Sequence, residues 1–115
     1  MISTHTFLQG VFPFSGDGLD AFAPIGRGLC HRVPDGTFCQ ALYFRGGNST
    51  DELIVAALIR DNAVMRLFPI GARSDVHVPL RVVEDIDGGS IVELRLAAPA
   101  GTDGTVVVDL GLVEH

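Results

Sequence analysis

The stretch Thr105-Val106-Val107-Val108-Asp109-Leu110-Gly111-Leu112 decides the fold class of this 115-residue chain. Large apolar side chains occupy its even-numbered positions, while Thr105, Asp109 and Gly111 stand at odd-numbered ones. Successive side chains of an extended strand point to opposite faces of a sheet, so this period of two predicts a strand with one buried face. The stretch therefore indicates a β protein.

Two earlier stretches repeat the alternation. Apolar residues fall at every second position in 76–82 and again in 90–97. Pro79 interrupts the first stretch, and because proline cannot donate a hydrogen bond to a ladder, we expect that strand at a sheet edge or a bulge. Turn-forming residues at 99–104 follow the second stretch, so we expect strands 90–97 and 105–112 to form a hairpin.

Residues 52–60 permit two interpretations. The seven residues after Glu52 are all apolar, and Ser49 with Glu52 imitates the capping box of a helix. The β-branched residues of the run and the Asp61-Asn62 pair after it favour a strand buried on both faces, which turns tightly into another strand at 63–68. We expect the strand.

Glycine and proline are dense at residues 13–28. We interpret this segment as a long loop that holds one helical turn around Leu19 to Phe22. A loop of this length is often functional or part of an interface.

The segment Val33-Pro34-Asp35-Gly36-Thr37 has proline at the second turn position and glycine at the fourth. This is typical of a type I turn closed by a glycine bulge, and it predicts a hairpin in which facing residue numbers sum to 70. In this register His31 lies opposite Cys39, whereas Cys30 points to the other face. We therefore expect both thiols to be free.

The expected pairing of His31 with Cys39 is a candidate metal or redox site. An imidazole can lower the pKa of a thiol, and both groups are soft metal ligands. His5, His77 and His115 could join them, but no C-x-x-C, H-x-H or H-E-x-x-H spacing is present. A small buried thiol beside an ordinary histidine is the simpler interpretation, and a transition metal is the one cofactor hypothesis.

Arg45, Gly46, Gly47 and Asn48 open a stretch that we interpret as a loop between strands. Two glycines would free the backbone amides to form a concave nest, and Arg45 would add a fork for a carboxylate or phosphate. These four residues are therefore the ligand-binding candidates. The simpler alternative is a turn that needs glycine and asparagine for positive φ.

The acidic residues suggest no catalytic centre. Those at 84–89 lack the regular spacing of a calcium loop and are interpreted as a solvated turn. Asp109 would lie near Glu93 and Arg95 of its expected hairpin partner, which predicts a cross-strand ion pair rather than a general base. No nucleophile elbow or Ser/His/Asp order is evident, so catalysis is left undecided and is the less favoured interpretation.

Composition excludes several function classes. The net charge is −6, and the eight basic residues, all arginine, are scattered along the chain, so we expect no nucleic-acid partner. The absence of lysine excludes Schiff-base chemistry and a Walker-type phosphate lysine. No leader pattern or apolar run of membrane length is present, so we expect a cytoplasmic domain without a membrane partner.

The sequence thus predicts one domain over residues 1–115, an all-β antiparallel sandwich of seven to eight strands with an immunoglobulin-like or a jelly-roll topology. Apolar side chains exceed what one small sandwich can hide. Four fall on outward rows and four crowd the N-terminal region: Val83, Ile91, Val107, Val113, Phe7, Phe12, Phe14 and Phe22.

This excess favours a non-catalytic binding or assembly module, either a homo-oligomer or an accessory partner of a larger protein. One alternative is a metal-binding or redox protein that uses His31 and Cys39. The other is a small enzyme or ligand carrier with a pocket beside the Gly46-Gly47 loop and the segment 13–28.

Overall fold

The computed structural model describes residues 3–80 and 85–115 and confirms the all-β prediction. The strands are β1 (Thr4–Ser15), β2 (Gly18–Arg32), β3 (Phe38–Asn48), β4 (Ile54–Arg60), β5 (Ala63–Ile70), β6 (Asp75–Pro79), β7 (Ile86–Asp87), β8 (Ile91–Ala98) and β9 (Asp103–Glu114). Among the described residues there is no helix of the length and apolarity needed to cross a membrane.

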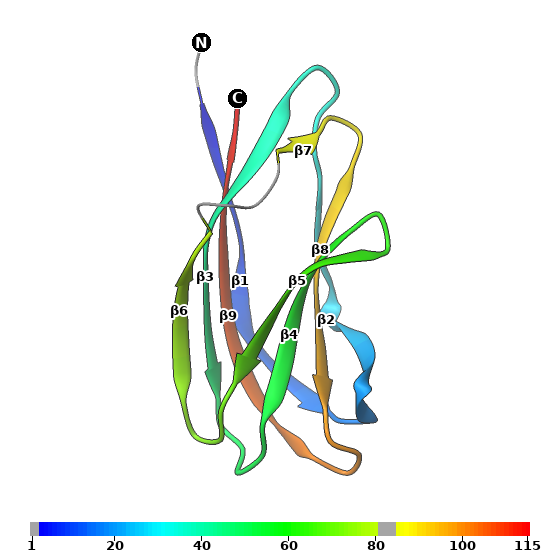
Figure 1. Ribbon diagram of the computed structural model, residues 1–115, viewed down its shortest axis with the longest axis vertical. Helices are drawn as coiled ribbons and strands as arrows, with labels where there is room; N and C mark the ends of the chain where they lie inside the picture. The colour runs from blue at the N-terminus through cyan, green and yellow to red at the C-terminus, as the bar shows by residue number, and fades with distance from the viewer. Residues whose placement is uncertain (1–2, 81–84) are drawn as a thin grey trace.

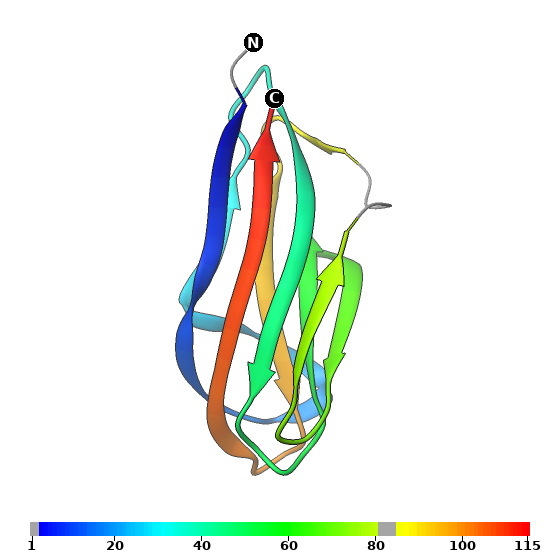
Figure 2. The ribbon, with the colours of Figure 1, turned by 90° about the vertical axis from the view of Figure 1, so that its left-hand side faces the viewer.

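The strands form two antiparallel sheets packed face to face, as Figures 1 and 2 show. Sheet A has the order β1-β9-β3-β6, with β7 also paired to β3, and sheet B has the order β2-β8-β4-β5. Consecutive strands lie in opposite sheets except at β4–β5 and β6–β7. This is the double Greek-key arrangement of a jelly roll, and it excludes the immunoglobulin alternative. The sandwich is elongated, 46 × 23 × 22 Å.

The core lies between the two sheets and is formed by the alternate residues of each strand whose side chains point inward. The even-numbered residues of 105–112 are at most 1% exposed, as their period predicts. Phe44 of β3 stacks on Phe68 of β5 with ring centroids 4.3 Å apart. This ring pair joins the two sheets and adds to the stability that burial alone provides.

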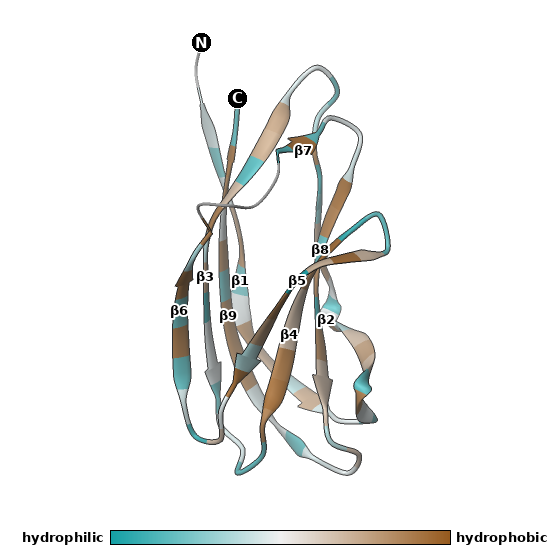
Figure 3. Ribbon diagram, viewed as in Figure 1, coloured by the Kyte–Doolittle hydropathy of each residue, from teal (hydrophilic) through white to brown (hydrophobic). Residues whose placement is uncertain are grey.

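Residues 54–60 form a strand, which confirms the favoured interpretation of the apolar run. Ile54 and the four residues 56–59 are buried, so both faces of β4 are covered, and Figure 3 colours much of the strand as hydrophobic. Asp61 and Asn62 have φ of 47° and 68°. Two successive positive φ angles are those of a type I′ turn, which leads directly into β5 as predicted.

The alternation predicted for 76–82 is confirmed as far as it is described. Val76, Val78 and Leu80 pack on the core, and Figure 3 shows hydrophobic and hydrophilic bands along β6. β6 lies at the edge of sheet A, as Pro79 requires. Residues 81–84, which include the expected outward-facing Val83, lie outside the described residues.

The predicted hairpin of the last two strands is wrong. β8 pairs with β2 and β4 in sheet B, whereas β9 pairs with β1 and β3 in sheet A. The loop at 99–102 carries the chain from one sheet to the other. Alternation fixes which face of a strand is buried, but it does not specify the partner strand, and a jelly roll uses the turn to change sheets.

The predicted hairpin around 33–37 is wrong for the same reason. A turn does form, because the Thr37 hydroxyl donates to the Pro34 carbonyl over 2.7 Å. The flanking strands nevertheless belong to opposite sheets, and Val33 bonds instead to Ser90, its N–H donating to the Ser90 carbonyl over 2.9 Å. The expected register between His31 and Cys39 therefore does not exist.

The predicted loop at 13–28 is also wrong. β1 continues to Ser15 and β2 begins at Gly18, with register shifts against β8 between Gly18 and Ala23 and between Pro24 and Leu29. β2 is an edge strand, where bulges are tolerated, so glycine and proline here mark irregularities within a strand rather than a loop.

Candidate functional site

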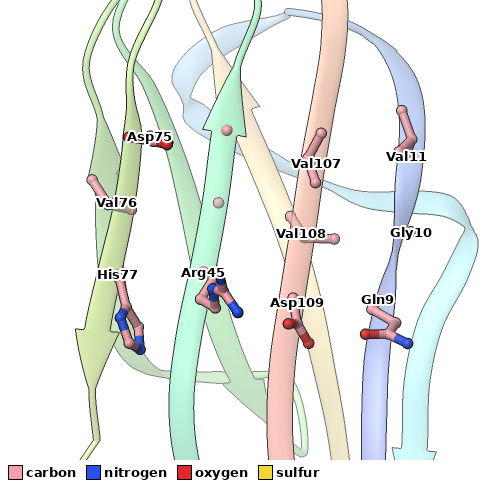
Figure 4. A pocket seen from close by; sticks show the side chains of 12 residues that line it. Gln9, Gly10, Val11, Arg45, Asp75, Val76, His77, Val107, Val108 and Asp109 are labelled. Carbon is pink, nitrogen blue, oxygen red and sulfur yellow. The ribbon is translucent and has the colours of Figure 1, made fainter.

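The outer face of sheet A carries a shallow groove of about 890 Å³ (Figure 4). It is lined from four strands by Gln9, Gly10, Val11, Arg45, Gly46, Gly47, Asp75, Val76, His77, Val107, Val108 and Asp109. Most of these residues are the outward positions of strands whose alternate residues form the core. The inward side chains of these strands form the core, and their outward side chains line the groove.

Four hydrogen-bonding side chains form a row across the groove. The strand register pairs Gln9 of β1 with Asp109 of β9, Asp109 with Arg45 of β3, and Arg45 with His77 of β6. Neighbouring strands are about 4.8 Å apart, so the row spans roughly 14 Å. It places an amide, a carboxylate, a guanidinium and an imidazole at regular intervals.

An aromatic row runs beside the polar one. Phe7 and Tyr43 both pair with Gly111, and a Cβ atom on Gly111 would lie 2.2 Å from Cε2 of Tyr43. Glycine at this position therefore lets the Tyr43 ring lie flat on the sheet. Phe7 is 49% exposed, and His77 meets Tyr43 edge-on with ring centroids 6.0 Å apart.

Tyr43 connects the two rows. Its hydroxyl donates to Asp109, 3.1 Å from Oδ1 and 3.2 Å from Oδ2. Burial raises the pKa of Tyr43, and the hydrogen bond to the Asp109 carboxylate raises it further. The hydroxyl therefore stays protonated and holds Asp109 in place, while the remaining lone pairs of the carboxylate can accept from a ligand.

Arg45 is exposed and makes no ion pair or side-chain hydrogen bond with any other described residue. Its five N–H donors are therefore available. Gly47, next to it on the outer face, has only Val107 within 4 Å of the position that a Cβ atom would take. The missing side chain leaves the floor of the groove open beside the guanidinium.

The groove continues toward the far end of the sheet. A second hollow of about 420 Å³ shares Gly47, Asp75 and Val107 with the first. Arg73 lies in it and forms a two-point ion pair with Asp51, at 2.8 and 3.4 Å. This pair lowers the pKa of the Asp51 carboxyl, mainly through the hydrogen bond. The two hollows together suit an extended ligand rather than a compact one.

The predicted ligand residues lie in β3 rather than in a loop, which is a correction. Arg45 and Gly47 face the groove, but Gly46 faces the core, where a Cβ atom would lie 2.8 Å from Cδ1 of Ile70. Arg45, Gly46 and Gly47 are paired in the ladders with β6 and β9, and Asn48 in the ladder with β9. These pairings leave no amide nest of the kind predicted, so an anion would have to be held by side chains.

Asn48 is a buried structural residue. Its amide donates to the carbonyls of Glu52, Ile70 and Gly71 over 2.7, 3.2 and 3.1 Å, and its Oδ1 accepts from the backbone and hydroxyl of Thr50 over 2.9 and 2.8 Å. These bonds tie the end of β3 to the turns around it. All of the bonding capacity of the side chain is directed inward.

His31 and Cys39, the predicted metal ligands, lie on strands of opposite sheets. His31 is hydrogen-bonded to Glu114 of β9, and Glu114 pairs in turn with Cys39 of β3. Burial, and then the charge of Glu114, raise the pKa of Cys39 to about 11. The thiol is thus protonated at neutral pH, and the described residues contain no group of three or more His, Cys, Asp or Glu placed to hold a metal ion.

The predicted ion pair of Asp109 is also wrong. Glu93 and Arg95 pair with one another in β8, 2.8 Å apart, on the opposite sheet from Asp109. Sequence reasoning therefore missed Gln9, Tyr43, His77 and Asp109 as members of one surface. Only the correct strand order would have revealed them, because they come from four strands far apart in the chain.

The sequence matches no protein-family model and no curated protein. Solved structures do resemble the fold. A carbohydrate-binding module, CBM36, in complex with calcium and xylotriose is similar over 94% of this chain and 97% of that chain, with a TM-score of 0.58 and 15% identity. The CBM36-1 domain of a multidomain xylanase from the hindgut metagenome of Trinervitermes trinervoides is similar over 96% of both chains, with a TM-score of 0.55 and 15% identity.

A structure of infectious bursal disease virus, Gx strain, is similar over 98% of this chain but only 31% of that chain, with a TM-score of 0.54 and 16% identity. The chain thus spans nearly the whole of the two carbohydrate-binding modules and about a third of the viral protein. At these identities the likeness establishes a shared fold.

Proposed function

We propose that this domain is a non-catalytic binding module that holds a carbohydrate chain in the groove of sheet A. The observation that carries the proposal is the row of Gln9, Asp109, Arg45 and His77 beside the Phe7 and Tyr43 rings. Sugars present hydroxyl groups around the ring edge and C–H groups on its faces. A surface with alternating donors, acceptors and aromatic rings complements both.

The shape of the groove supports an extended ligand. Two joined hollows run along the strands, and the outer positions from Arg45 to Ser49 span about 13 Å at the rise of a β-strand.

The similar carbohydrate-binding modules support the proposal as an analogy of fold. The calcium of that xylotriose complex is not carried over to this chain, because the described residues contain no group of three or more His, Cys, Asp or Glu side chains placed to hold a metal ion. Recognition would instead depend on the side chains of the groove itself.

Calorimetric titration with soluble xylan, β-glucan and an anionic polysaccharide tests the proposal. We expect one of them to bind. Arg45→Ala and Asp109→Ala should each raise the dissociation constant at least about tenfold, because each removes one polar contact that the bound sugar would cover. Arg32→Ala is the matched control, because Arg32 is an exposed arginine paired with Asp35 away from the groove. The proposal is wrong if no polysaccharide binds, or if Arg32→Ala and Arg45→Ala have equal effects.

A second candidate function is assembly, as a homo-oligomer or as an accessory partner of a larger protein. The exposed apolar side chains on the outer face of sheet A favour it, chiefly Phe7, Val11 and Val107, which are 49%, 65% and 48% exposed. One structure of similar fold is the VP2 subviral particle of infectious bursal disease virus. Light scattering after size exclusion tests it, and a monomer at every concentration without a copurifying protein would contradict it.

A further inference from the structure

Asp75 lies where the two hollows on sheet A meet. Together with Gly47 and Val107 it lines both the larger groove and the smaller hollow. The register pairs Asp75 of β6 with Gly47 of β3, so the position opposite Asp75 carries no side chain. Figure 4 shows the Asp75 carboxylate on the side of β6 that faces β3. A ligand long enough to occupy both hollows therefore passes beside this carboxylate.

The Asp75 carboxylate is exposed and forms no ion pair with another described residue. Arg73 lines the smaller hollow, but Asp51 already holds its guanidinium through two contacts of 2.8 and 3.4 Å. An ionised carboxylate has two oxygens and only accepts hydrogen bonds. The acceptors of Asp75 are therefore open to the donors of a ligand.

The charged side chains around Arg45 carry an excess of negative charge. Asp109 lies directly opposite Arg45 in the ladder with β9, and Asp75 lies diagonal to it in the ladder with β6. Opposite residues in a sheet are about 5 Å apart and diagonal ones about 7 to 8 Å apart. A ligand carboxylate placed on Arg45 would thus lie within about one Debye length, 8 Å, of two like charges. The single guanidinium is insufficient to make the groove a site for anions.

We propose that Asp75 makes this groove selective for neutral sugar chains, because its carboxylate accepts hydrogen bonds from ligand hydroxyls and repels chains that carry carboxylates. Hydrogen bonds to an ionised acceptor are stronger than those between neutral groups. The net charge of −6 adds to the repulsion of an anionic chain. The inference rests on the proposed function, since it names the class of carbohydrate that the same groove takes.

Calorimetric titration with xylan and β-glucan, and with lightly substituted carboxymethyl and hydroxyethyl derivatives of each, tests the proposal. The two substituents are similar in size, so charge is the main difference between the derivatives. The titrations are run at about pH 8, where an imidazole is ordinarily uncharged. For the polymer that binds, we expect the carboxymethyl form to have a dissociation constant at least about tenfold higher than the hydroxyethyl form. Salt screens repulsion, so this ratio should decrease between about 0.01 and 1 M salt.

Asp75→Asn distinguishes selection from a merely structural role, because it should move the two dissociation constants in opposite directions. The hydroxyethyl form should bind about threefold more weakly, since an amide oxygen is a weaker acceptor than a carboxylate. The carboxymethyl form should bind at least about threefold more tightly, since one like charge is gone. Circular dichroism verifies that the variant, altered at an exposed residue, is folded.

Asp20→Asn is the matched control for the loss of one negative charge. Asp20 is exposed on β2 of sheet B and lines neither hollow. Its substitution should change both dissociation constants by less than about twofold, because a distant exposed charge is largely screened.

The outcomes separate this inference from the proposed function. If no neutral polymer, derivative or anionic polysaccharide binds, both are wrong. If only anionic chains bind, or if the two derivatives bind equally or lose binding equally, the selection of neutral chains is wrong while carbohydrate binding is unaffected. If Asp75→Asn moves both constants in the same direction, or has the same effect as Asp20→Asn, Asp75 is not the residue that selects.

Discussion

The two thiols of this protein have opposite environments. Cys30 is exposed on β2, whereas Cys39 is buried on β3 and both are free. A thiol reacts as its thiolate, and burial disfavours the charged form. We therefore expect one cysteine per folded chain to react rapidly with an aromatic disulfide reagent at neutral pH, and the second only after unfolding. Cys30→Ser should abolish the fast phase. Two fast thiols in the folded protein would contradict the burial of Cys39.

The raised pKa of Cys39 makes stability depend on alkaline pH. Its ordinary value of 9.0 rises to about 11 in the fold, first through burial and then through Glu114. The folded state therefore holds this proton more tightly than the unfolded state, so the contribution is complete below pH 9.0 and is lost as the pH rises toward 11. We expect urea unfolding to report a decrease of about 2 to 3 kcal/mol over this window.

Cys39→Ala should reduce the loss in the free energy of unfolding between pH 9 and pH 11. The pKa of Tyr43 is also raised, first by burial and then by its hydrogen bond to Asp109, and Tyr43→Phe measures the contribution of this residue separately. If Cys39→Ala retains the full slope, another group is responsible for it.

Among the buried polar residues that the structure describes, truncation of Asn48 should lower the free energy of unfolding most, because its side chain makes five hydrogen bonds. Asn48→Ala removes five hydrogen bonds, including those donated to three carbonyls near the end of β3, of which the Glu52 carbonyl keeps the Thr50 hydroxyl as a donor. Unsatisfied buried groups are costly, so the free energy of unfolding should fall by about 2 to 4 kcal/mol. Ser74→Ala, which removes one exposed bond to Ala72, should change it by about 0.5 kcal/mol or less. Similar values for both variants would contradict the role of Asn48.

At the scale of elements, the β4–β5 turn depends on two residues with positive φ. Asn62, at φ 68°, also accepts a hydrogen bond from Arg95 over 2.8 Å. Asn62→Ala should lower the free energy of unfolding by about 1 to 2 kcal/mol, because alanine is strained there. Asn62→Gly loses the same hydrogen bond but adopts the angle freely, and it should be the more stable of the two in thermal unfolding. The reverse order would show that the turn is not type I′.

Strands could be predicted from the sequence far better than their partners. The alternation at 105–112 and the Asp61-Asn62 turn are local, and each has one physical solution, so β9 and the β4–β5 hairpin were predicted correctly. The turns at 33–37 and 99–104 are compatible with a hairpin and with a crossover between sheets. Nothing within the turn distinguishes these two, because the choice depends on which strands complete each sheet.

β2 was misinterpreted for a different reason. Six glycines and prolines between 13 and 28 normally indicate a loop, but at a sheet edge they can act as bulges in a continuous strand. An edge strand need not satisfy the pattern of a central one. Local composition therefore could not distinguish these possibilities.

The candidate site exists only at the scale of the whole molecule. Gln9, Arg45, His77 and Asp109 are adjacent because β9 lies between β1 and β3, and β6 follows β3. The sequence singled out Arg45 and Gly47 through an interpretation of their loop that was wrong, and it related Asp109 to the wrong strand. A surface assembled from four distant segments becomes visible only with the topology.

The same topology governs the rate of folding. The β1–β9 ladder pairs Thr4 with Glu114, and most ladders join distant segments. Such non-local pairing predicts slow folding, in the range of about milliseconds to seconds. Stopped-flow refolding followed by the fluorescence of Tyr43, the one tyrosine of a chain without tryptophan, measures it. Microsecond refolding would contradict this expectation.

The strands β8 and β9 lie in the interior of their sheets. β8 lies between β2 and β4, and β9 lies between β1 and β3. Both come from residues 91–114, which the ribosome adds to this domain last. At typical translation speeds the preceding 90 residues take about 5 to 20 s to synthesise. During that interval β1 and β2 have no strand to pair with and β3 has only β6 and β7, so most of the backbone of these strands stays unpaired until the final segment emerges.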